Sequence, residues 1–199
     1  MPLKRIVLAA LAAFVGACTS EQPAPTETEF TAPLYVKGGN GHINLETHMT
    51  GDEEILVVAE GAPHPSDSEA QGQAIFRVDG DLVHFRLIAS NIENVVQSHI
   101  HCGRPGENGP IRMWLFPDIG TTGTALTPGE LGRQDGVLNA GTFSHVGVIC
   151  PAANVGTNMP LLDAIRAGLT YVNVHTNNGG TANTGPGDFQ GGEIRGQID

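Results

Sequence analysis

Residues 72–90, GQAIFRVDGDLVHFRLIAS, carry the clearest structural signal in this chain of 199 residues. Apolar and polar side chains alternate on both sides of Asp79-Gly80, a pair suited to the positive φ angles of a tight turn. Residues two apart on a strand share a face, so the stretch predicts a β-hairpin with one buried face and a solvated His84. The side chains expected on the buried face are Val83, Phe85 and Leu87.

Short apolar or alternating runs bounded by turn-forming residues predict further strands on either side of this hairpin. Glycine (27 residues) and proline (13 residues) are abundant and long helical patterns are scarce, which favours an all-β fold. One short helix is expected near residues 159–168, where Asn158 can cap and Pro160 suits the first turn. The further strands are expected at residues 30–36, 43–49, 53–61, 111–116, 137–143, 170–176 and 193–198.

Residues 1–17 are typical of a signal peptide, because two basic residues precede an apolar run too short to span a bilayer as a mature helix. The stretch VGAC, which ends at Cys18, resembles a bacterial lipobox, so Cys18 is the expected lipidation site. An ordinary cleaved signal peptide is the alternative. Thr19 resembles the pattern of outer-membrane sorting. We therefore expect an exported lipoprotein of the cell envelope, held at the outer membrane on its periplasmic or its outward side.

Residues 18–29 are rich in Pro, Thr and Glu and predict a flexible tether between this lipid anchor and one domain over residues 30–199. The formal net charge is −11, and the few scattered basic residues form no phosphate-binding patch, which argues against nucleic acid as a partner. Nucleophile elbows, zinc-protease pairs, phosphate loops and dinucleotide fingerprints are all missing from the sequence. We therefore expect a protein that is not an enzyme.

The chain has three cysteines. Acylation of Cys18 leaves Cys102 and Cys150, and an even pair in an oxidising compartment ordinarily forms a disulfide. The alternative is that Cys102 acts as a metal ligand, because it directly follows two histidines.

The stretch SHIHCG, residues 98–103, sets His99 and His101 on the same side of a strand, which is the spacing that Zn(II) or Cu(II) needs from an extended segment. Two later strands carry polar stripes on the face opposite their apolar residues. If these stripes lie beside the two histidines, the site holds three imidazoles, a carboxylate and a guanidinium. The stripes are Tyr171, Asn173 and His175 on one strand and Glu193, Arg195 and Gln197 on the other.

Two interpretations of this constellation remain open. In the first, the stripes only hold strands together, with the histidines donating to backbone carbonyls and Glu193 pairing with an arginine. In the second, His99, His101 and His175 bind copper or zinc. Glu193 is then a fourth ligand, or it accepts a hydrogen bond from one of the metal-binding histidines. In both, Arg195 and Asn173 belong to the surrounding polar cluster.

From about Ile43 to Asp199 the chain resembles the chordin-type (CHRD) domain family. The resemblance rests on the hairpin, on the stretch NIENVVQSHIHCGRPGENGPIRMWLF, and on the blocks LLDAIRAGLTYVNVHTNNGG and GGEIRGQI. It implies an extracellular β-sandwich, with His99, His101, His175, Glu193 and Arg195 at the family's characteristic polar positions. Cys102 and the long stretch TNNGGTANTGPGDFQGG depart from the family pattern.

A fainter similarity at the level of fold is to Cu/Zn superoxide dismutase, a Greek-key β-sandwich with an H-x-H copper motif and an internal disulfide. The additional copper histidine and the histidine-rich zinc loop are not found here, so dismutase activity is not expected. Two function classes result. One is an anchored, non-catalytic module with an extracellular protein or matrix partner, and the other is an envelope protein that binds copper or zinc.

Overall fold

The computed structural model describes residues 43–56, 65–117, 132–179 and 184–199, all within the second of two compact units, Tyr35–Asp199. The expected signal peptide, Cys18, the tether and the strand at residues 30–36 lie outside the described residues. Within the described part of the chain, no helix is long and apolar enough to span a membrane.

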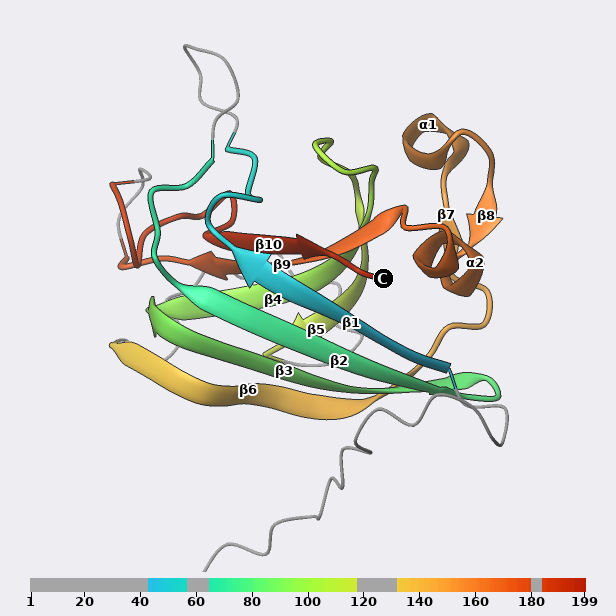
Figure 1. Ribbon diagram of the computed structural model, residues 1–199, viewed down its shortest axis with the longest axis horizontal. Helices are drawn as coiled ribbons and strands as arrows, with labels where there is room; N and C mark the ends of the chain where they lie inside the picture. Colours follow the sequence, from blue (N-terminus) through green and yellow to red (C-terminus); the bar gives the residue numbers. More distant parts are fainter. Residues whose placement is uncertain (1–42, 57–64, 118–131, 180–183) are drawn as a thin grey trace, which may run out of the picture. The chain divides into compact units, whose positions relative to one another are not determined.

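The all-β prediction is confirmed (Figure 1). Eight of the described strands form one antiparallel sheet in the order β5-β4-β9-β10-β1-β2-β3-β6, and β7 pairs separately with β8. The strands are β1 (Ile43–Thr50), β2 (Gln71–Asp79), β3 (Leu82–Glu93), β4 (Val95–Cys102), β5 (Ile111–Phe116), β6 (Arg133–Ser144), β7 (Ile149–Cys150), β8 (Met159–Pro160), β9 (Thr170–Thr176) and β10 (Ile194–Gln197), and the helices are α1 (Ala152–Val155) and α2 (Leu161–Arg166).

The hairpin of β2 and β3 has the predicted buried face, since Val83, Phe85 and Leu87 are at most 1% exposed. Its turn comes one residue later than expected, because Asp79 pairs with Leu82 and leaves Gly80 and Asp81 as the loop. Gly80 has a φ of +57°, a conformation that costs glycine little, so it supplies the first position of the turn.

Asn94 connects β3, in one half of the sheet, to β4, in the other half. Its φ of 54° lies in the left-handed region, which asparagine tolerates better than most residues. Its side chain fixes the corner, with Nδ2 donating to the carbonyl of Gly187 at 3.1 Å and Oδ1 accepting from the amide of Gly132 at 2.8 Å. The chain thereby passes from one layer to the next within a single residue.

The two halves of the sheet enclose one apolar core, as expected for a β-sandwich. They are parts of one continuous sheet, because β10 pairs with β1 at Arg195 and Thr50. The edge strands β5 and β6 also approach each other, where Asn139 Nδ2 donates to the carbonyl of Leu115 at 2.6 Å. Core side chains come from both halves and include Phe76, Phe85, Leu87, Ile100, Val172, Val174 and Ile194.

The predicted helix forms as α2, but its start differs from the expectation. Pro160 is the residue before the first helical position, and Asn158 does not cap α2. The side chain of Asn158 accepts a hydrogen bond from the amide of Ala152 at 2.9 Å and so serves the start of α1, a helix that the sequence did not predict.

The strand expected at residues 53–61 is wrong in its described part. The amide of Glu54 donates to the carbonyl of Gly51 at 3.1 Å, which closes a turn directly after β1. Glu53 lies in this turn, Glu54 and Ile55 follow without regular structure, and residues 57–61 lie outside the described residues. This turn places Glu54 in the interior, a position that matters for the site below.

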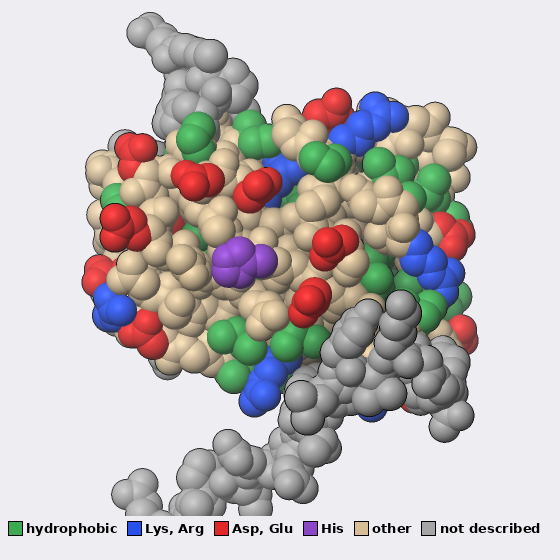
Figure 2. Space-filling view, viewed as in Figure 1, with side chains coloured by type: hydrophobic (Ala, Val, Ile, Leu, Met, Phe, Trp, Pro, Cys, Tyr) green, Lys and Arg blue, Asp and Glu red, His purple; other side chains and the backbone are tan. Residues whose placement is uncertain are grey.

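Acidic side chains dominate the charge visible on the face shown in Figure 2, where Asp and Glu outnumber Lys and Arg. This agrees with the formal net charge of −11. A surface of this kind favours solubility and weakly attracts cations.

Candidate metal centre

The polar stripes meet because β9 lies between β4 and β10 in the sheet. In the register of β4 with β9, His99 is opposite Asn173, His101 is opposite Tyr171 and Gln97 is opposite His175. Ile100, Val172 and Val174 point into the core, as predicted. The outward side chains of these strands therefore form one polar layer on the far side of the sheet from the core.

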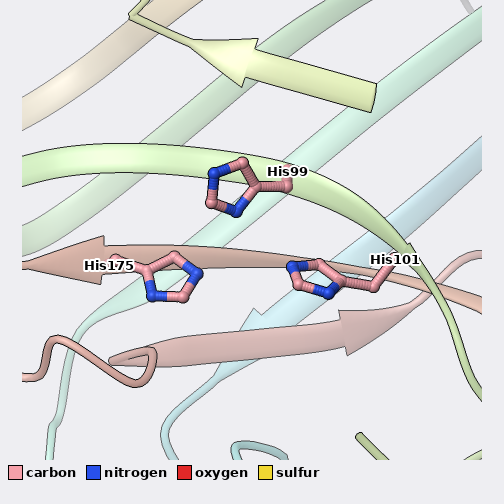
Figure 3. Close-up of side chains that lie close together, drawn as sticks. All are labelled: His99, His101 and His175. Carbon is pink, nitrogen blue, oxygen red and sulfur yellow. The ribbon is translucent and has the colours of Figure 1, made fainter. Parts of the chain in front are cut away.

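Within this layer His99, His101 and His175, here called the histidine trio, gather in one place (Figure 3). One nitrogen from each ring lies within 4.8 Å of one nitrogen of each other ring. The ring centroids of His99 and His175 are 5.0 Å apart, and those of His99 and His101 are 5.4 Å apart. The three side chains are buried, with exposures of 0%, 7% and 7% respectively.

Backbone carbonyls fix the orientation of two of the rings. His101 Nδ1 lies 2.7 Å from the carbonyl of Gly109, and His175 Nδ1 lies 2.8 Å from the carbonyl of Gln190. Since a carbonyl only accepts, each Nδ1 carries the proton and each Nε2 is left with its lone pair. The Nε2 atoms of both rings, and both nitrogens of His99, are buried and make no hydrogen bond of good geometry, although the Asn173 side chain lies close to His99 and His101.

The trio is held neutral. Burial, together with repulsion between a charged ring and its neighbours His175 and His101, lowers the pKa of His99 to about 2. Burial likewise lowers the pKa of His101 to about 3 and that of His175 to about 4. Neutral imidazoles with free lone pairs are the form that binds transition metals.

Arg195 holds the loop that covers His101. Its guanidinium donates to the carbonyl of Glu107 at 2.8 Å and to Asn108 Oδ1 at 3.0 Å, which fixes the segment that carries Gly109. The guanidinium also lies 3.5 Å from the centre of the Tyr171 ring, which is itself stacked on His101 at 4.8 Å. Arg195 therefore belongs to the polar cluster as predicted, and it positions His101 through two independent contacts.

Glu193 does not join the histidine trio. Its Oε2 accepts from Thr176 Oγ1 at 2.6 Å and from the amide of Gly187 at 2.9 Å, while its Oε1 accepts from Ser68 Oγ at 2.5 Å. The alternation that would put Glu193 beside Arg195 does not hold, because β10 begins only at Ile194 and Glu193 lies in a bend. Its carboxylate instead organises the turns before β10.

Sequence reasoning missed Glu54, which is 2% exposed and lies near the trio's neighbour Asn173. A Cβ at Gly192 would collide with Glu54 Oε2 and approach Asn173 Nδ2 to 3.1 Å, so both groups border the space beside this glycine. Burial raises the pKa of Glu54 to about 7. Asn173 Oδ1 and Glu54 Oε2 are both buried without a hydrogen-bond partner.

Trp114 of β5 borders the trio, a place that was not predicted from the sequence. It is 7% exposed and stands edge-on to His99, with ring centroids 4.2 Å apart. Because β5 pairs with β4 at Trp114 and His99, the alternation of the β5 strand could have indicated this contact once the pairing was known. Trp114 closes the trio on the side away from β9.

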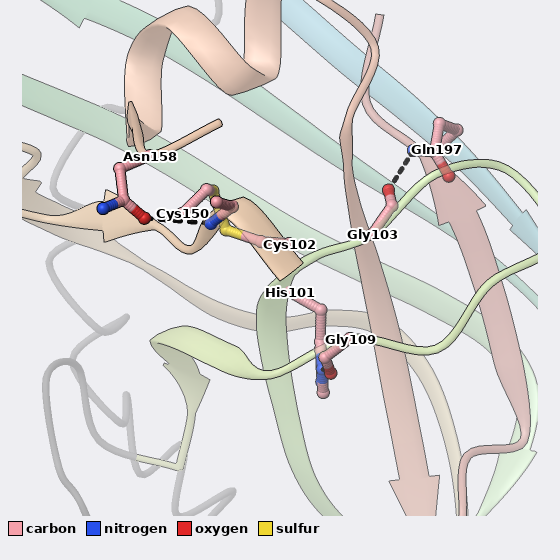
Figure 4. The surroundings of a disulfide bond; sticks show 8 residues. His101, Cys102, Gly103, Gly109, Cys150, Asn158 and Gln197 are labelled. Atoms are coloured by element: carbon pink, nitrogen blue, oxygen red, sulfur yellow. Dashed lines mark hydrogen bonds between the residues drawn. A yellow bond between two sulfur atoms is a disulfide. The ribbon is translucent and has the colours of Figure 1, made fainter. Parts of the chain in front are cut away.

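The predicted disulfide between Cys102 and Cys150 is confirmed (Figure 4). Both cysteines are fully buried on the core side, and their Cα atoms are 5.5 Å apart. The alternative of Cys102 as a metal ligand is therefore wrong, since its sulfur is bonded to Cys150. The bond joins the end of β4, next to His101, to β7.

The packing interpretation accounts for only part of this geometry. Two histidines do bond to backbone carbonyls, as that interpretation expected, but Glu193 accepts from hydroxyl groups and an amide. Packing also leaves four ring nitrogens of the trio without partners. Burial of an unsatisfied polar atom costs roughly 1–3 kcal/mol. One nitrogen from each of the three rings lies within 4.8 Å of the others, so the group could hold a metal ion.

The family model of the CHRD domain matches residues 45–198, and the chain therefore belongs to the CHRD domain family. Membership of this family suggests a binding or interaction module. Searches of curated proteins and of solved structures found no match.

Proposed function

We propose that this domain binds a copper or zinc ion through His99, His101 and His175. The observation that carries the proposal is the convergence of three buried, neutral imidazoles whose inward nitrogens have no hydrogen-bond partner. Imidazole nitrogen is a ligand that both metals accept, and carbonyl acceptors on the opposite ring nitrogens are the usual support for metal-binding histidines.

The role proposed is binding and not catalysis. Arg195, Tyr171 and the carbonyls of Gly109 and Gln190 fix the rings before an ion arrives, so little conformational entropy has to be lost on binding. A preorganised and buried site of this kind suits storage or buffering of an ion.

Metal titration of the purified protein, followed by calorimetry and elemental analysis, tests the proposal. Wild type is expected to bind a single ion per chain, and His99→Ala and His175→Ala are expected to bind none. The matched controls are His84→Ala, on the outward face of β3, and His48→Ala, at an exposed position of β1. Both should bind the ion as wild type does. Equal binding by wild type and His99→Ala would contradict the proposal.

The second part of the proposal concerns where the domain acts. The resemblance of residues 15–18 to a lipobox supports acylation at Cys18 and a lipid-anchored, exported protein, with residues 18–29 as tether. Mass spectrometry of the mature protein should find an acylated Cys18 at its N-terminus, and Cys18→Ser should move the protein out of the membrane fraction. Recovery of Cys18→Ser in that fraction at the wild-type level would contradict lipid anchoring.

A further inference from the structure

The donor set of the histidine trio is electrically neutral, and this bears on the charge of the ion it can hold. Each imidazole is neutral, and within the described residues no carboxylate or thiolate joins the group of converging nitrogens. Glu193 is engaged with Thr176 and Gly187, and Cys102 is in a disulfide. A bound ion would therefore keep its full charge in this site.

The ring nitrogens that converge are also buried. The inward nitrogens of all three rings are shielded from water as well as lacking partners in the protein. Zinc with three protein ligands ordinarily takes a water as its fourth ligand. Because these nitrogens are shielded from solvent, the site disfavours a water as a further ligand of the ion.

The positive charge of Arg195 lies close to the trio. The guanidinium of Arg195 is stacked on Tyr171, and Tyr171 is stacked on His101 with an angle of 10° between the rings. Only the Tyr171 ring links the guanidinium of Arg195 to His101, with 3.5 Å from the guanidinium carbon to the ring centre and 4.8 Å from that centre to the centre of the His101 ring. The guanidinium must oppose any other cation there in proportion to that cation's charge.

These three features act in the same direction on the choice of metal. The cost of moving an ion out of water rises with the square of its charge, so a divalent ion loses about four times as much solvation as a monovalent one in a shielded site. Three neutral nitrogen ligands, a shielded position and a nearby cation therefore favour a monovalent transition-metal ion over a divalent one.

We propose that the histidine trio binds monovalent copper, Cu(I), in preference to Zn(II). This inference rests on the proposed metal-binding function and specifies its ligand. The buried carboxyl group of Glu54 borders the space beside Gly192 with Asn173 and is not among the converging ligand atoms, and its burial favours the uncharged form.

Competition with chromogenic chelators tests the proposal on the folded protein. Under anaerobic conditions, wild type should withdraw one equivalent of Cu(I) from bicinchoninate, and it should hold Zn(II) at least about 1,000-fold more weakly in a parallel competition with a zinc-binding dye. His99→Ala should lose Cu(I) binding and His84→Ala should keep it. Ag(I), a monovalent ion that does not oxidise in air, should displace Cu(I).

The outcomes separate the two proposals. Zn(II) bound as tightly as Cu(I) would overturn the preference for a monovalent ion and leave metal binding intact. Binding of neither ion would overturn both. Arg195→Gln should narrow the gap between Cu(I) and Zn(II) by at least about 10-fold, and Arg195→Lys, which keeps the charge, should narrow it less. An equal gap in wild type and both variants would contradict the part assigned to Arg195.

Discussion

The β2–β3 hairpin and the β4–β9 pair are both antiparallel, but they differ in what lies on their outward faces. Along β2 and through residue 90 of β3, buried and more exposed side chains alternate, whereas every residue of β4 and β9 is buried. The hairpin packs on the core through one apolar face, and its other face is more exposed. The β4–β9 pair also carries a polar layer that loops cover, and the protein keeps unsatisfied nitrogens there.

Among the changes that test this comparison, removal of the disulfide at the end of β4 is expected to have the largest effect on the stability of the domain. The bond closes a loop with a sequence separation of 48, which contributes about 4 kcal/mol in the chain-entropy account. The double variant Cys102→Ala/Cys150→Ala should lose about this much free energy of unfolding in urea, with Cys18→Ser as the matched control. Hydrogen exchange should speed up first in β4 and β9, and uniform acceleration that includes β2 and β3 would contradict the account.

Acidification should weaken the domain through the histidine trio. In the folded protein burial holds the pKa of His175 at about 4, whereas the unfolded value is about 6.5. Between these values the unfolded chain binds a proton that the folded protein refuses, so the free energy of unfolding falls as pH falls.

His175→Gln measures this contribution in the absence of metal. As the pH falls from roughly 6.5 to 4, the free energy of unfolding of this variant should decrease by about 1.4 kcal/mol less per pH unit than that of wild type. His84→Gln, at a half-buried position on the outward face of β3, is the matched substitution. Identical pH profiles for wild type and His175→Gln would show that His175 is not held neutral.

The smallest changes in unfolding free energy are expected from substitution of two outward-facing amide side chains, Asn173 and Gln73. Asn173→Ala should cost about 1–3 kcal/mol of unfolding free energy, because the Asn173 side chain is buried against Glu54 and His99 and its loss would leave these polar groups with fewer neighbours. Gln73→Ala on β2 should cost less than about 0.5 kcal/mol, because its contact with Glu46 is at the surface. If Asn173→Ala and Gln73→Ala lowered the free energy of thermal or urea unfolding equally, the outward faces of β9 and β2 would not differ as the comparison requires.

Alternation along the chain was enough to predict much of the fold and three members of the site. His99, His101 and His175 stand on strands whose apolar partners, Ile100 and Val174, face the core, and this set the direction of the rings. Their convergence still required the adjacency of β4 and β9, which local patterns do not contain. The sequence patterns left that adjacency as a condition, that the polar stripes lie beside the two histidines.

The errors occur where regular strand geometry ends. Glu193 was assigned to the site by extending the alternation of β10 past its first residue, Ile194, into a bend. Glu54 was overlooked because a turn at Gly51, stabilised by a backbone hydrogen bond, carries it inward from a segment that had been expected to form a strand. Both positions depend on long-range contacts of loops, which periodicity does not encode.

Anomalous diffraction from crystals of the copper-loaded protein tests the central claim most directly. The account predicts one copper peak enclosed by His99, His101 and His175, with nitrogen atoms of all three rings at about 2.0–2.1 Å. Copper found only at surface histidines such as His48, with the three buried rings unchanged, would contradict it.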